Sequence, residues 1–147
     1  MDAETQIESF IGKFTDEVAA QIRAARAEMQ RRLPGAVELV YDNYNALAIG
    51  YGSSEKLEDV VFSIACFPRW VRLFFYRGAA LDDPDGLLEG AGSQVRSIRL
   101  TRLSLLGDPP VRVLMAQALA NAPPIDPSRP NRSVVKSVSP NQRRRRP

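Results

Sequence analysis

The chain has 147 residues, enough for one domain with a short additional segment. Of these residues, 44% are hydrophobic and 25% charged, as is usual in globular proteins. It contains no histidine, which excludes imidazole-based triads, dyads and metal centres. Its net charge of +3 is unevenly distributed, because residues 123–147 carry seven basic side chains and one acidic one, whereas the rest of the chain carries a net −3. The basic excess therefore belongs to the tail.

The N-terminal region predicts two helices. Apolar residues at i, i+3, i+4 and i+7 define one helical face: Ile7, Phe10, Ile11 and Phe14. The hydroxyl of Thr15 is suited to cap a second helix, which is predicted to end before Pro34-Gly35 because the residue before a proline resists helical geometry.

From Val37 the apolar period changes to two, which predicts β-strands. Five strands are expected: from Val37, from Leu47, over residues 60–67, over residues 71–76 and over residues 94–100. Strands that follow one another without intervening helices favour an antiparallel meander.

A last helix is predicted to begin at Asp108-Pro109, where the aspartate is suited to cap it, and to end at Asn121. Residues 123–147 are rich in proline, serine and arginine and poor in apolar groups, so we expect them to be disordered. The predicted fold is α+β. A single domain over residues 1–122 has two N-terminal helices, about five antiparallel strands in meander order and one C-terminal helix, followed by a disordered basic tail.

Motifs with chemical meaning are few. Cys66 lies within an apolar strand, which is typical of a small buried side chain rather than a reactive thiolate. The loop Asp82-Asp-Pro-Asp-Gly86 resembles a capped turn more than a calcium loop, and Gly90-Ala-Gly92 lacks the third glycine of a dinucleotide-binding turn. We therefore predict no catalytic, metal-ligating or cofactor-binding residue from these patterns.

Aromatic and arginine residues are interleaved on the predicted strands: Tyr44, Tyr51, Trp70, Phe74 and Tyr76 with Arg69, Arg72, Arg96 and Arg99. Such a surface can stack bases or hold an acidic ligand; alternatively, the aromatics are core and the arginines line the solvated face. Trp70 follows Pro68, which interrupts the two predicted strands, and loops at such interruptions place side chains at the mouths of clefts. The predicted ligand- or partner-binding residues are Tyr44, Arg69, Trp70 and Arg96.

Four consecutive arginines, Arg143 to Arg146, have two interpretations: a solubilising terminus, or weak non-specific contact with nucleic acid. No membrane association is expected, because the most apolar stretch, residues 60–76, is interrupted by Pro68 and carries Arg69 and Arg72. The acidic N-terminus has no signal-type apolar run, and we expect a cytoplasmic protein.

Several segments carry a family resemblance in their order along the chain: a helix ending in Pro34-Gly-Ala-Val-Glu38, strands over residues 62–74, Gly90-Ala-Gly-Ser-Gln-Val-Arg96, Ile98-Arg-Leu100 and a closing helix. Over about residues 15–121 the chain resembles the YdhG-like family, a widespread bacterial domain of unknown function. Where many relatives have Tyr-Gly-Met-Pro, this chain has Tyr41-Asp-Asn-Tyr44, and Trp70 stands where many have a histidine.

The resemblance implies an α+β domain with a central antiparallel sheet. Some members are described as frataxin-like iron chaperones, which implies iron held by surface carboxylates. The acidic helix residues suited to this role, or equally to helix N-termini, are Glu4, Glu8, Asp16 and Glu17. Iron is the one cofactor suggested, and it is suggested by the resemblance alone.

These patterns lead us to expect a non-enzymatic binding or accessory module that contacts a small molecule or a protein partner. Two alternatives stay open: an iron-binding, chaperone-like protein that uses surface carboxylates, and an enzyme that uses Asp, Glu or Tyr as acid and base. The second alternative lacks any paired motif among the carboxylates.

Overall fold

A computed structural model describes all 147 residues of the chain. It contains three α-helices and six β-strands, together with three short 3-10 helices. The helices are α1 (Ala3–Ile11), α2 (Asp16–Arg32) and α3 (Pro109–Ala120), and the strands are β1 (Val37–Asp42), β2 (Leu47–Gly52), β3 (Val60–Cys66), β4 (Val71–Phe75), β5 (Arg96–Arg99) and β6 (Arg132–Val138). The predicted α+β class is confirmed.

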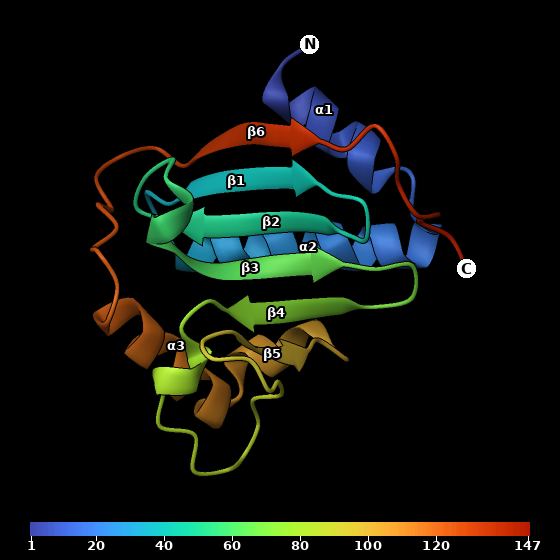
Figure 1. The fold of residues 1–147 in the computed structure, drawn as a ribbon. Coiled ribbons are helices and arrows are strands. Elements are labelled where there is room, and N and C mark those ends of the chain that lie inside the picture. Colours follow the sequence, from blue (N-terminus) through green and yellow to red (C-terminus); the bar gives the residue numbers. More distant parts are fainter.

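The six strands form one mixed sheet in the order β5-β4-β3-β2-β1-β6 (Figure 1). Strands β1 to β5 pair antiparallel with their sequence neighbours, in the expected meander. The last strand, β6, lies parallel to β1 at the sheet edge. The prediction of about five strands, all antiparallel, is therefore wrong by one parallel strand.

The prediction of a disordered tail is also wrong. β6 hydrogen-bonds to the free edge of β1, and its two central valines divide between the two faces of the sheet. Val135 packs against the main core, while Val134 packs against Leu39 on the opposite face. A polar composition favours disorder only when no partner is present, and here the partner is a backbone edge that composition does not reveal.

The helices cover one face of the sheet. In Figure 1, α2 runs behind the central strands, and α1 lies beside β6 at the top of the view. The side chains that β1 to β5 direct toward the helices form one core with those of all three helices, including Tyr51, Phe62 and Phe75, each with no exposed surface. The Thr15 hydroxyl accepts a hydrogen bond from the Val18 amide and caps α2 as predicted.

The opposite face of the sheet carries no helix (Figure 1). Pairing registers define rows of side chains across this open face, and one row reads Tyr41, Ala48, Ala65, Arg72 and Arg99. Next to this row, Tyr41, Tyr76 and Val134 pack over a small apolar cluster of Val37, Leu39 and Val60. The open face thus has an apolar part over β1 and a cationic part over β4 and β5.

Two local expectations are corrected. Asp108 occupies the N-cap position of α3, but its carboxylate makes no capping hydrogen bond and instead accepts from Arg102 Nη2 at 2.7 Å. The sequence also favours a helical turn over residues 87–90, but Glu89 forms a β-bridge with Ser97. None of the helices is both long enough and apolar enough to cross a membrane.

Candidate functional site

Two hairpin turns and the C-terminal segment meet where the strands of the sheet end, not along its outer strands. Asp42, Leu47, Cys66 and Val71 are paired in one register row, so residues 43–46 and 67–70 leave the sheet at the same level. Residues 139–147 return to this edge after β6, and the Arg143 amide donates to the Tyr44 carbonyl at 2.9 Å. We call these three segments, with the adjoining ends of β4 and β5, the turn edge; it lies at the right of Figure 1.

Three of the four predicted binding residues lie on the turn edge. Tyr44, in the β1–β2 turn, is 51% exposed, and Trp70, in the β3–β4 turn, is 36% exposed beside the exposed Arg69. Arg96 lies elsewhere, because it pairs with Phe75 at the far end of β4 and β5. Its guanidinium donates to the carbonyls of Gly92 and Val95, and these bonds hold the local loop.

Arg99, one of the interleaved arginines but not one of the four predicted binding residues, lies beside Trp70. The guanidinium carbon of Arg99 lies 5.0 Å from the centroid of the Trp70 ring. Arg72, which pairs with Arg99 across the strands, bonds Ser97 Oγ and lies 3.6 Å from Glu89. Meander order contains the signal for this neighbour: in an antiparallel sheet the end of β5 adjoins the start of β4, which favours Arg99 over Arg96.

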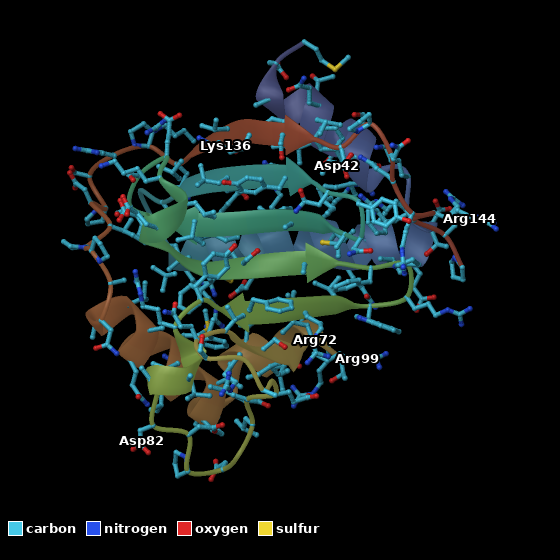
Figure 2. The ribbon with its side chains drawn as sticks, in the orientation of Figure 1. Asp42, Arg72, Asp82, Arg99, Lys136 and Arg144 are labelled. Carbon is cyan, nitrogen blue, oxygen red and sulfur yellow. The ribbon has the colours of Figure 1, made fainter.

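A second arginine lies over an aromatic ring at the other side of the turn edge. The guanidinium carbon of Arg143 is 5.6 Å from the centroid of the Tyr44 ring. The tail is positioned there by Arg145, which points inward and bonds Asp42 and the Asn43 carbonyl. Consequently Arg145 is buried, whereas Arg143 and Arg144 face outward (Figure 2 labels Arg144).

The turn edge is strongly basic. Arg69, Arg99, Arg143 and Arg144 form no ion pair, and residues 43–46, 67–70 and 139–147 contain no Asp or Glu. The nearest acidic group is Glu89, which is exposed and lies 3.6 Å from Arg72. Other nearby acidic groups are either neutralised or on the helical side. Asp42 has no exposed surface and is paired with Lys13 and Arg145, and Asp16 and Glu17 begin α2 behind the sheet.

Stacking prepares these guanidinium groups for anions. An arginine that lies over a ring keeps its N–H donors at the rim of the guanidinium plane, where a carboxylate or phosphate accepts two of them at once. Arg99 and Arg143 make no hydrogen bond through their side chains, so all these donors are available. The arrangement supports anion binding.

Three groups suited to acid–base or nucleophilic chemistry, Cys66, Glu38 and Tyr51, are enclosed. Cys66 is fully buried, which raises the pKa of its thiol far above the usual value. Glu38, 1% exposed, accepts hydrogen bonds from Arg26, Gln30, Tyr51 and Ser133 between α2 and the sheet. Burial, followed by the Glu38 charge, raises the pKa of Tyr51 well above 10. This network joins α2 to β1, β2 and β6.

Two of the four carboxylates considered for iron have other partners. Glu4 bonds Arg26 at 2.7 Å, and Glu8 bonds Arg23 at 3.1 Å. Nowhere in the chain do three Asp, Glu, Cys or His side chains come together in an arrangement suited to a metal ion. In the loop of residues 82–86, Asp83 accepts from the amides of Leu87 and Leu88, as expected for a capped turn.

Comparisons with known proteins add no identification. No family model matches the chain, and neither curated proteins nor solved structures include a significant match.

Proposed function

We propose that this protein is a non-enzymatic binding module of the YdhG-like type, and that its turn edge binds an anionic ligand. The observation that carries the proposal is the Arg99 guanidinium over Trp70, which has no carboxylate partner and no hydrogen bond. Arg69 lies next to Trp70 in the same turn, and Arg72 is the cross-strand neighbour of Arg99.

The surroundings support access for a ligand. Ala48 and Ala65 continue the row of Arg72 and Arg99 across the open face, so small side chains lie beside the cationic ones. Figure 2 shows Arg72 and Arg99 side by side at the ends of their strands. A ligand approaching from the open face meets the guanidinium groups of Arg72 and Arg99.

Intrinsic fluorescence tests this proposal, because Trp70 is the only tryptophan of the chain. We expect inorganic pyrophosphate, titrated at low ionic strength, to change Trp70 emission in a saturable manner. Arg99→Ala should weaken the apparent affinity by about tenfold, the value of one good charge-assisted contact of roughly 1.4 kcal/mol. Arg99→Lys should lie between, since lysine lacks the two-pronged geometry.

The matched control is Arg112→Ala. Arg112 is exposed on α3, away from the turn edge, and its side chain makes no ion pair. This variant removes the same net charge and should titrate like wild type. Equal affinities for wild type, Arg99→Ala and Arg112→Ala would refute binding at Trp70.

A further inference from the structure

We propose that the turn edge binds single-stranded nucleic acid, whose phosphates reach both stacked arginines, Arg99 and Arg143. This inference rests on the proposed function and extends it, since it names the ligand class and adds the C-terminal segment to the site. It starts from a repetition: the same unit, an unpaired guanidinium over an exposed ring, occurs twice on one edge.

The spacing of the two units selects an extended ligand. Tyr44 lies in the turn between β1 and β2, while Arg99 lies on β5 beside β4. About three and a half interstrand spacings separate them, which amounts to roughly 17 Å. A single phosphate or carboxylate contacts one unit only, whereas a chain with repeated anionic groups contacts both.

Cations are placed along the path between the two units. Arg69 lies in the β3–β4 turn, between the two pairs in strand order, and Arg144 follows Arg143. Both side chains are exposed and unpaired. The four arginines therefore supply a row of positive charge without interspersed carboxylates, which complements a phosphodiester backbone.

The aromatic rings favour nucleic acid over an acidic peptide. Sites for single strands combine a basic track with flat surfaces on which bases stack, and arginine planes serve as well as aromatic rings. Here each basic unit is itself a stacked arginine and ring, Arg99 with Trp70 and Arg143 with Tyr44. An acidic peptide would use the charges but leave the stacking surfaces without a matching group.

Fluorescence anisotropy with labelled oligouridylates of 2, 6 and 12 nucleotides, using the full chain, tests the inference. The length series rests on the span of roughly 17 Å between the two units. We expect the 6-mer to bind at least tenfold more tightly than the 2-mer, because it reaches both units. Arg99→Ala and Arg143→Ala should each weaken 6-mer binding by about tenfold and lower the salt slope by about one, whereas Arg112→Ala should lower neither.

Three results would overturn the inference. If pyrophosphate binds at Trp70 but the 6-mer binds no more tightly than the 2-mer, the proposed function stands and the extended site fails. If Arg143→Ala behaves like Arg112→Ala, the second unit takes no part. If a glutamate hexapeptide binds as tightly as the 6-mer, the edge recognises charge alone and stacking has no role.

Discussion

Arg145 and Asp42 form an ion pair at 2.9 Å, although 103 residues separate them in sequence and both side chains are almost inaccessible to solvent. Asp42 also accepts a hydrogen bond from Lys13 Nζ at 2.7 Å, so two cations neutralise one enclosed carboxylate. The Arg145 guanidinium lies 5.9 Å from the centroid of the Phe14 ring. The third arginine of the C-terminal run is thus part of the folded core.

Removal of residues 132–147 should destabilise the domain strongly. The deletion removes the β6 ladder on β1, takes the Ser133 hydroxyl from Glu38 and leaves Asp42 without Arg145. Loss of one partner of a buried pair alone costs about 3–5 kcal/mol. We expect the urea midpoint to fall sharply or the chain to be unfolded. An unchanged midpoint would mean that the tail does not dock.

A point substitution separates the ion pair from the strand. Arg145→Ala should lower the free energy of unfolding by about 3 kcal/mol, because Asp42 keeps only Lys13 in an enclosed site. Arg144→Ala, the adjacent exposed arginine, should change it by less than about 0.5 kcal/mol. Chemical denaturation of both variants measures the difference, and similar values for the two would argue that Arg145 is solvated.

Hydrophobic period located most of the fold but not this tail. Residues 60–67 are predicted as a strand, and β3 spans Val60–Cys66. A strand that is buried along its whole length leaves a recognisable apolar pattern in the sequence. In β6 the apolar residues are Val134, Val135 and Val138, too few to predict a strand. Its order comes from the edge of β1, a long-range partner that no local pattern specifies.

The candidate site was predictable to a similar extent. The interruption between strands that Pro68 predicts correctly places Arg69 and Trp70 in a turn, and both are exposed there. The position of Arg99 over Trp70 depends on the register of β4 and β5, and that of Arg143 over Tyr44 depends on docking of the tail. Both are tertiary relationships, so the sequence pattern names the residue types of the turn edge but does not show which of them meet.

Acid should weaken the domain partly through Asp42. Burial alone would raise the pKa of this carboxyl, but hydrogen bonds, led by that of Lys13, outweigh burial and lower it below 3.8. A depressed pKa in the folded state contributes stability above the unfolded pKa of about 3.9, and this contribution is lost as pH falls through the folded value.

The pH prediction is measurable with Asp42→Asn. This variant should be less stable than wild type at pH 7, and its stability should fall less steeply below pH 4. Glu28, whose pKa Arg31 and Arg32 lower to about 2, titrates in the same range in both proteins, so its contribution cancels when the two are compared. Parallel curves for the two proteins below pH 4 would show that Asp42 makes no such contribution.

Glu38 should be the most sensitive position of the buried network. Tyr51→Phe removes one donor, Tyr51 Oη at 2.7 Å, and should cost about 1–2 kcal/mol. Glu38→Ala should cost more, about 3–5 kcal/mol, because it leaves Arg26 enclosed with only the exposed Glu4 as counter-ion. Urea melts compare the two variants. A smaller loss of stability for Glu38→Ala than for Tyr51→Phe would contradict the central place of Glu38 in the network.

The two helix starts make a matched pair for the last prediction. Thr15 Oγ1 accepts from the Val18 amide at 3.3 Å, whereas Asp108 directs its carboxylate to Arg102. Thr15→Ala should therefore cost about 1 kcal/mol, the usual value of a lost cap. Asp108→Ala removes a surface ion pair, worth under about 1 kcal/mol, and high salt should shrink that loss but leave the Thr15→Ala loss unchanged. Melts of both variants with and without 1 M NaCl distinguish the two cases. If the Asp108→Ala loss is as large and as salt-independent as the Thr15→Ala loss, Asp108 caps α3 in solution after all.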